Sequence, residues 1–480
     1  MNSSIVVVKP QSFSPHKHWY SKALNAQIHP VVSFFMNMDN ERIIQRFSYL
    51  NPSIDAEYLR DLLKYTPKYF KWAGTDLMHT TTTEGMKQMV VIETNSCPSG
   101  QKSFPLLDEN NEKGGYEELI SKTFLPIWKK SPLKKGVTCV VYDKNPMENS
   151  GYAATIADLI KKDVYLVEYH EEDYGKCIRF NSETRAIELL INDKWTPVRT
   201  IFRYVTQKPW NRLPLFSKTR IFNPIIACLA GGRNKLMAAK AYDFLNAEVA
   251  EAGLEIKTPT TIWDVNKNEI PLWLEKFGYK GVIKIPYSNA GQGVFTIINE
   301  KELEAFMDLD IPYQKFIIQR LVGHYAWSTY HENELLFQVG TIPSKRQNSY
   351  VFDLRMLVHT TENGLRPLGL YSRKAEEPLT ANIAGKDSKN ILMTNLSVKK
   401  GEHEWDSDTS RLLLMDQRDF NKLGLSLDDL IEGYVQSVLA MIAIDKMAKR
   451  LVTTKKTFRR KLFTSLNDDE TLLNELFKEK

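Results

Sequence analysis

The sequence predicts a protein of mixed α/β and α+β class with two or three domains. Its 480 residues are too many for one compact core. Between residues 136 and 168 a strand, a helix and a second strand follow one another, an order that is typical of a parallel α/β unit. Beyond residue 281, two strands joined by a glycine turn are followed by a helix and a third strand, which indicates a smaller α+β unit.

Since no internal repeat is present, the other elements are predicted from the spacing of apolar residues and from the residues that favour turns between them. Apolar residues at three-to-four spacing between positions 43 and 63 predict amphipathic helices within the first 70 residues. The expected strands are 86–95, 136–142, 163–168, 186–190, 200–204, 281–287, 295–298, 315–322, 353–358 and 368–373. The expected helices after residue 70 are 116–128, 153–162, 233–253, 300–309 and 427–451.

Composition and charge exclude several classes of protein. Hydrophobic residues make up 42% and charged residues 25%, so neither a disordered nor a fibrous chain fits. The 64 Lys and Arg exceed the 58 Asp and Glu too slightly to indicate nucleic acid as the main ligand. The four cysteines form no C-x-x-C pair, which indicates reduced thiols. Since the sequence shows neither an apolar stretch long enough to span a membrane nor a secretory signal, we expect a cytoplasmic protein with no membrane partner.

Glu93 and Asn95 stand two residues apart on an expected strand, so their side chains point to the same face. Neighbouring oxygen ligands suit a hard cation such as magnesium. Asp76 lies one hairpin upstream and could supply a third oxygen. The alternative interpretation is that Glu93 and Asn95 are solvent-facing positions of an edge strand.

Lys284 lies on an expected strand between apolar residues, four positions before a glycine loop at 288–294. A buried lysine needs an anionic partner, and backbone amides on flexible glycines can bind phosphate oxygens. The loop is neither a P-loop nor a Rossmann turn, since no helix follows it. The alternative is a lysine on the exposed face of an alternating strand beside an ordinary turn.

Asp353 and Arg355 repeat the same-face spacing, and Arg373 ends the next expected strand. Two arginines directed at one place suit a phosphate or a carboxylate. Lys235 follows Asn234 at the start of a long helix. The alternative is that the arginines form surface salt bridges and that Lys235 is an ordinary exposed lysine.

In their order along the chain, these features resemble the ATP-grasp superfamily. In that family an N-K pair opens a helix, a V-x-K-P-like strand precedes a glycine-rich lid, and an adenine-binding hinge, D-x-R, an arginine and an N-I motif follow. The matching segments here are Asn234-Lys235, Val282-Ile283-Lys284-Ile285-Pro286, 289–293, 318–323, 353–355, Arg373 and 382–385.

The last element of the family, a G-x-D hairpin with E-x-N and a proline, is found near the other end of the chain, at 74–76 and 93–98. This order resembles the circularly permuted branch, which includes glutathionylspermidine synthetases and some peptide ligases. The resemblance implies a circularly permuted ATP-grasp fold with an α/β pre-grasp domain. Its domains would span 1–105 (N-terminal helices and metal-binding hairpin), 106–225 (pre-grasp domain) and 226–480 (the rest of the ATP-grasp domain with C-terminal helices).

The resemblance implies ATP and Mg²⁺ as cofactors and gives each matched residue a role. Phosphate contacts would come from Lys235 and Lys284, below a lid formed by Asn289, Gly291 and Gly293. The adenine hinge would be Gln319, Arg320, Leu321 and Val322. Magnesium would be held by Asp76, Glu93 and Asn95, and the transferred phosphate or acyl phosphate would face Arg355 and Arg373. The hinge departs from the family pattern because Gln319 is neutral, which leaves the ribose contact unassigned.

The implied activity is that of an ATP-dependent carboxylate-amine ligase, which forms an amide or peptide bond through an acyl phosphate. Phosphorylation makes the carboxylate electrophilic, while cations neutralise the developing charge and a lid excludes water. The alternatives are an ATP-grasp kinase acting on a small-molecule hydroxyl and a non-catalytic ATP-binding scaffold. Amino acids, peptides and polyamines are candidate substrates, and the loops 207–223 and 341–350 are candidate acceptor sites. Neither the substrates nor the oligomeric state is predicted, and Cys97 is read as a small buried hydrophobic residue.

Overall fold

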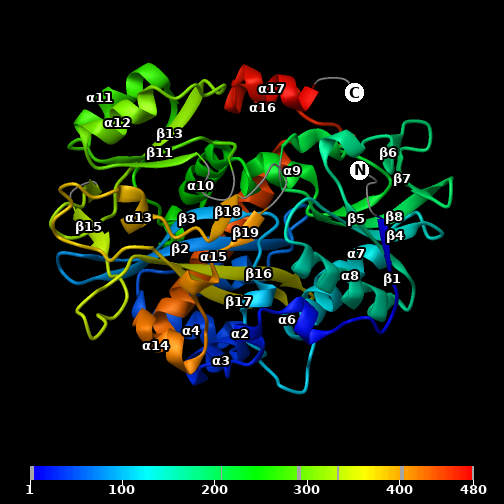
Figure 1. The fold of residues 1–480 in the computed structure, drawn as a ribbon, viewed down its shortest axis with the longest axis horizontal. Helices are drawn as coiled ribbons and strands as arrows, with labels where there is room; N and C mark the ends of the chain where they lie inside the picture. Colours follow the sequence, from blue (N-terminus) through cyan, green and yellow to red (C-terminus); the bar gives the residue numbers. More distant parts are fainter. Residues whose placement is uncertain (1–4, 207, 289–292, 332–333, 400–404, 478–480) are drawn as a thin grey trace.

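The computed structural model describes residues 5–206, 208–288, 293–331, 334–399 and 405–477. Two seven-stranded sheets and one four-stranded sheet account for most of its strands (Figure 1). A two-stranded ribbon of β18 (Ser397–Lys399) and β19 (Trp405–Ser407) adds to them. The predicted mixture of α/β and α+β architecture is confirmed.

The first sheet has the order β1-β5-β4-β8-β7-β6, with β9 beside β8. Its strands are β1 (Ile5–Val8), β4 (Val137–Tyr142), β5 (Val164–Glu168), β6 (Ile178–Asn181), β7 (Ala186–Ile191), β8 (Lys194–Tyr204) and β9 (Arg220–Phe222). Strands β4 and β5 are parallel and are joined by helix α8 (Pro146–Ile160), which confirms the predicted strand-helix-strand unit. Strand β4 is also parallel to β8, so the carboxyl ends of both lie at one edge.

The second sheet is the four-stranded one and is antiparallel throughout, in the order β10-β13-β11-β12. Its strands are β10 (Thr261–Asn266), β11 (Gly281–Lys284), β12 (Val294–Ile297) and β13 (Lys315–Arg320). One face packs on helices α11 (Ile270–Lys276) and α12 (Glu300–Met307) through a core that includes Ile283, Phe316 and Ile318. Because side chains alternate along a strand, Val282 and Lys284 face the opposite way, toward a cavity.

The third sheet combines strands from distant parts of the chain, in the order β14-β15-β2-β16-β17-β20, with β3 on the other side of β2. Its strands are β2 (Trp72–Thr82), β3 (Lys87–Asn95), β14 (Tyr330–His331), β15 (Glu334–Gln338), β16 (Phe352–Thr361), β17 (Gly364–Lys374) and β20 (Leu412–Leu413). Asp76 pairs in register with Glu93 on one side and with Arg355 on the other. Strands β2 and β3, from near the start of the chain, therefore lie in one sheet with the strands that carry Asp353 and Arg373.

Helix α15 (Leu427–Arg450) supports the third sheet and is buried along most of its length. It contacts β2, β3 and β16, and it also packs on α10 (Lys235–Val249). Its buried Asp445 accepts hydrogen bonds from the backbone N–H groups of residues 68–70 and from the Tyr65 hydroxyl, at 2.7 to 3.0 Å. This carboxylate fixes the segment that leads into β2.

Shorter helices cover the remaining surfaces. They are α1 (Pro15–His18), α2 (Ser21–Leu24), α3 (Pro30–Asn37), α4 (Asn40–Leu50), α5 (Ala56–Leu63), α6 (Gly114–Leu119), α7 (Leu125–Lys129), α9 (Ile225–Ala227), α13 (Ser388–Leu392), α14 (Gln417–Leu423), α16 (Arg460–Leu466) and α17 (Glu470–Phe477). Among the helices of the described residues, none combines the length and the apolar character that crossing a bilayer requires.

The observed elements differ from the expected ones in several places, and strands β2, β6, β9, β10, β14 and β15 were not expected. Strand β1 was missed because its four residues stand alone before the helices, and it becomes a strand by pairing with β5. Helix α8 begins at Pro146, seven residues earlier than expected, since proline suits the first turn of a helix. Strand β11 ends at Lys284 instead of continuing to 287.

Candidate functional site

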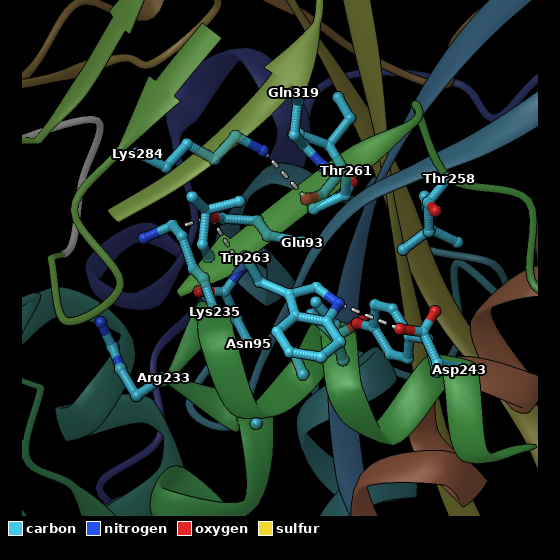
Figure 2. A pocket seen from close by; sticks show the side chains of 18 of the residues that line it. Glu93, Asn95, Arg233, Lys235, Asp243, Thr258, Thr261, Trp263, Lys284 and Gln319 are labelled. Carbon is cyan, nitrogen blue, oxygen red and sulfur yellow. Dashed lines mark hydrogen bonds and ion pairs between the residues drawn. The ribbon is translucent and has the colours of Figure 1, made fainter. Parts of the chain in front are cut away.

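A cavity of about 650 Å³ lies where the three sheets meet, and we call it the main cavity. Its walls come from β11 to β13 of the second sheet, from β2, β3, β16 and β17 of the third sheet, and from the loop after β4 of the first. A smaller pocket of about 50 Å³, the side pocket, shares part of this lining and is drawn in Figure 2. The residues common to both are Ile92, Glu93, Asn95, Arg233, Lys284 and Gln319.

Glu93 and Asn95 lie together on β3, as their spacing predicted. Asn95 Nδ2 donates a hydrogen bond to Glu93 Oε1 at 3.2 Å. The Glu93 side chain is 30% exposed, and its Oε2 lies 3.7 Å from Lys235 Nζ. Both residues line the main cavity, so they face a concave site and not open solvent.

Two lysines approach Glu93 from different elements (Figure 2). Lys235 is the first residue of α10, whose N-cap Asn234 accepts a hydrogen bond from the Met237 N–H. The Lys235 ammonium donates to the Ser288 carbonyl oxygen at 2.7 Å, and burial lowers its pKa. The sequence placed Lys235 correctly at the start of the long helix.

Lys284 extends from β11 and is only 4% exposed, so the alternative of a solvent-facing lysine is wrong. Its Nζ lies 3.4 Å from the Ile92 carbonyl oxygen. Burial lowers the pKa of Lys284 to about 8, with Glu93 acting to raise it and Lys235 to lower it. A buried ammonium with a depressed pKa is a group that a bound anion would stabilise.

Asp76, Asp353, Arg355 and Arg373 form a buried cluster of alternating charge across β2, β16 and β17. Arg355 donates to both Asp76 oxygens, at 2.5 and 2.7 Å, and Arg373 Nη2 lies 2.9 Å from Asp76 Oδ2. Arg373 also pairs with Asp353. Burial raises the pKa of the Asp76 carboxyl, but the two arginines outweigh it and hold that pKa at about 2.

The arginines therefore do converge, and the group on which they converge is Asp76. Both oxygens of Asp76 accept from guanidinium groups, whereas Glu93 and Asn95 stay at the cavity surface. Within the part of the chain that the structure describes, no three His, Cys, Asp or Glu side chains gather as in a metal site.

The four expected hinge residues line the main cavity: Gln319 and Arg320 end β13, and Leu321 and Val322 follow it. The amide of Gln319 donates to the Thr261 hydroxyl at 2.8 Å, and the Arg320 guanidinium lies over the Phe277 ring. Leu321 and Val322 are buried, and Val282 lines the cavity as well, so this wall offers an apolar surface.

The glycine loop connects β11 to β12 in an antiparallel hairpin, as predicted. Asn289 and Gly291 lie outside the described residues. Gly293 has φ +75°, and its carbonyl oxygen accepts a hydrogen bond from the Ile285 N–H at 2.7 Å. A residue with a side chain would be strained there, which explains the glycine.

Several basic residues of the main cavity were not predicted. Lys144 follows β4, Lys102 lies beyond β3, and Arg233 precedes α10. One signal could have indicated Lys144, because ligands of parallel α/β sheets bind at the carboxyl ends of strands.

The loops 207–223 and 341–350 were proposed as acceptor sites, but none of their described residues lines the main cavity. Part of the loop 207–223 instead surrounds a separate cavity of about 220 Å³ near Tyr169 and Leu476. Cys97 does line the main cavity, but burial raises the pKa of its thiol to about 11. It therefore remains a protonated thiol at neutral pH.

No protein-family model matches the sequence, and neither does any curated protein. Comparison with solved structures does find matches. A glutathione synthetase-like effector from Globodera pallida is 10% identical with a TM-score of 0.42, over 77% of this chain and 89% of that one. A RimK domain ATP-grasp protein from Sphaerobacter thermophilus is 13% identical with a TM-score of 0.30, over 49% and 90% of the two chains.

The ATP-grasp ligase PsnB, solved in complex with a minimal precursor, is 10% identical with a TM-score of 0.25, over 49% and 89% of the two chains. Two of these three similar structures are described as ATP-grasp proteins.

Proposed function

We propose that this protein is an ATP-dependent carboxylate-amine ligase that forms an amide bond through an acyl phosphate. The observation that carries the proposal is the distribution of charge around the main cavity and the adjoining side pocket. Lys235 and Lys284 approach Glu93 at one side, and Arg355 and Arg373 lie in the wall beside it. A cavity of about 650 Å³ falls in the size range of small-molecule sites.

The nucleotide would bind between the second and third sheets. Its phosphates would contact the ammonium groups of Lys235 and Lys284. The base would lie on the apolar wall at Gln319 to Val322. This arrangement is supported by the burial of Lys284, because a buried cation without a full counter-charge favours an anionic ligand.

Glu93 and Asn95 fit a magnesium ion that also binds phosphate oxygens. Glu93 keeps a partly exposed carboxylate at the cavity surface, and Asn95 donates through Nδ2, so its Oδ1 can serve as a second oxygen. Asp76 would act mainly by orienting Arg355 and Arg373, to which its oxygens are bonded. A bound magnesium ion would neutralise charge on the phosphates.

The arginines would stabilise the phosphoryl group as it moves to the substrate carboxylate. Arg355 is fixed by two bonds to Asp76, and Arg373 is fixed by Asp76 and Asp353. Cations that are already oriented need no rearrangement as negative charge develops, and this is how such groups lower a barrier. Enclosure by the three sheets would protect an acyl phosphate from water.

A turnover assay tests the proposal. Purified protein with ATP and magnesium would be incubated with a panel of carboxylates and amines, with ADP release followed and products identified by mass. We expect ADP release that needs both substrates and yields an amide, and no release with Glu93→Gln. A phosphorylated hydroxyl product would overturn the proposal in favour of a kinase, and nucleotide binding without turnover across the panel would favour a scaffold.

A further inference from the structure

The second sheet and its two helices are joined covalently to the rest of the chain at one end. We call residues 261–320 the second-sheet unit. The chain enters it at Thr261 and leaves it after Arg320, and these positions are neighbours because Thr261 pairs in register with Gln319. The Arg320 N–H also donates to the Thr260 carbonyl oxygen at 3.0 Å. A unit that is attached at one end can rotate there unless other contacts hold its far end.

The far end of the unit contacts the C-terminal arm, which we define as residues 460–477 and which contains α16 and α17. In Figure 1 the arm lies between the second sheet and the first. Asp469 is fully buried, and its Oδ2 accepts hydrogen bonds from the backbone N–H groups of Gln314 and Lys315, at 3.0 and 3.4 Å. Its Oδ1 accepts from the Leu472 N–H at 3.1 Å and so caps α17. One carboxylate therefore joins the arm to the start of β13.

Two more hydrogen bonds join the arm to the same end of the unit. Asn467 Oδ1 accepts from the Tyr287 hydroxyl at 2.7 Å, and both side chains are buried. The Thr471 hydroxyl donates to the Pro312 carbonyl oxygen at 2.9 Å. Separating the arm from the unit would leave buried groups without their partners, which is unfavourable.

On its other side the arm is fixed to parts of the protein outside the unit. Glu475 Oε1 accepts from the Trp210 N–H at 3.0 Å, and the Glu475 carbonyl oxygen accepts from Asn211 Nδ2 at 2.7 Å. The Leu466 carbonyl oxygen accepts from the Lys240 ammonium of α10 at 2.6 Å. The arm thus connects the far end of the unit to the loop after β8 and to α10.

The arm can detach without disturbing a sheet. Its helices α16 and α17 have seven and eight residues, and helices of this length are not stable on their own in water. Two other helices also bond to the unit, α10 through the Lys235 N–H and the Pro286 carbonyl oxygen, and α13 through the Ser388 hydroxyl and the Thr296 carbonyl oxygen. The arm is easier to release than α10, because α10 packs along α15 in the interior.

The arm holds the unit at the end that a rotation would move most. Strand β13 runs from Lys315, beside the arm, to Arg320 at the attached end, and its six residues span about 17 Å at about 3.3 Å per residue. Lys284 lies between these ends because it pairs in register with Ile317. Rotation at the attached end would therefore withdraw the Lys284 ammonium from the Ile92 carbonyl oxygen, which is 3.4 Å away on β3.

We propose that the C-terminal arm is a latch that holds the second sheet against the third and controls access to the main cavity. With the latch engaged, Lys284 stays buried beside Glu93. With the latch released, the unit rotates at its attached end and the cavity opens between β11 and β3. This inference is independent of the proposed ligase chemistry, because it concerns only how two walls of the cavity are held together.

Chemical modification of Lys284 tests the latch, because its buried amine becomes accessible when the unit moves away. Ligand-free protein would be treated with acetic anhydride at pH 8, and the rate at each lysine followed by mass spectrometry. We expect Asp469→Ser to raise the rate at Lys284 about ten-fold or more, since serine still caps α17 but does not bridge to β13. The near-isosteric pair Tyr287→Phe with Thr471→Val should raise it as well, and this pair provides the test if Asp469→Ser does not fold.

Two controls separate a latch from general loosening of the fold. Ser465→Ala removes an exposed hydroxyl of the arm that bonds to the Leu462 carbonyl oxygen within α16, and it should leave the rate at Lys284 unchanged. Lys71, a half-buried lysine before β2 that lines neither cavity, should react at the wild-type rate in every variant. An unchanged rate at Lys284 in the latch variants, an equal rise at Lys71, or an equal effect of Ser465→Ala would overturn the inference. Failure of both latch variants to fold would overturn it too, since a latch is separable from the core.

Discussion

Replacing Lys284 by methionine should weaken nucleotide binding and, at the same time, stabilise the protein. Methionine has a similar length and no charge, and position 284 is 4% exposed. Burial is the main cause that lowers the pKa of Lys284 from 10.5 to about 8. At about 1.4 kcal/mol per pKa unit, the charged form is disfavoured by about 3 kcal/mol in the nucleotide-free protein, so removing the charge should raise its melting temperature.

The pH dependence of this stabilisation has a defined sign. The folded-state pKa is below the unfolded value, so the charged lysine destabilises the fold fully below pH 8. The penalty falls as pH rises from about 8 and vanishes above about 10.5, where the amine is neutral in both states. Melting curves in a metal chelator should therefore show the variant above the wild type at pH 7, with the difference shrinking toward pH 10.

Nucleotide affinity should change in the opposite direction. A charge-assisted contact to phosphate contributes about 1.5 to 3 kcal/mol, so Lys284→Met should weaken ATP binding about ten-fold to over a hundred-fold. Calorimetric titration with a non-hydrolysable ATP analogue measures it, and Lys301→Met on exposed α12 is the control. Unchanged affinity in Lys284→Met, or a lower melting temperature at pH 7, would refute the reasoning.

Three further predictions concern carboxylates. Glu93→Gln should abolish magnesium-dependent turnover, and wild-type rates at ordinary magnesium would contradict this. The melting temperature should stay within a few degrees of the wild type, because the Glu93 side chain is at the cavity surface. Asp76→Asn should lower the free energy of unfolding by about 3 to 5 kcal/mol even in a chelator, since the substitution leaves Arg355 and Arg373 without a full counter-charge. Denaturant titration measures this free energy, and an unchanged value would argue against a structural role for Asp76. Asp445→Ala should destabilise the fold by about 3 kcal/mol, because the substitution removes the acceptor for three backbone N–H groups. The rate of hydrogen exchange at residues 68–70 should increase, and an unchanged rate there would refute this role of Asp445.

The local geometry of the site was predictable from the sequence wherever it depends on strand alternation. Glu93 and Asn95 share a face because side chains two apart on a strand always do. Asn234 caps the long helix as its residue type suggests. The hairpin around the glycine loop was indicated by two apolar runs flanking small residues.

Burial and long-range pairing were not predictable in the same way. Lys284 has apolar neighbours on both sides, so the sequence alone does not say which face of the strand is covered. The bond between Asp76 and Arg355 depends on the register of strands that are 279 residues apart. Lys144 lies in a loop, and a loop has no regular spacing of apolar residues from which the direction of a side chain could be predicted.

The central place of β2 in the third sheet also constrains how the protein is made. β2 and β3 emerge early in synthesis, but β16 and β17, which complete the charge cluster around Asp76, are translated more than 250 residues later. Until then, one edge of β2 is unpaired and Asp76 lacks its arginines. Sheets that depend on such distant pairing fold slowly and expose strand edges meanwhile. The charge cluster around Asp76 is therefore completed late, and only in chains that extend past Arg373.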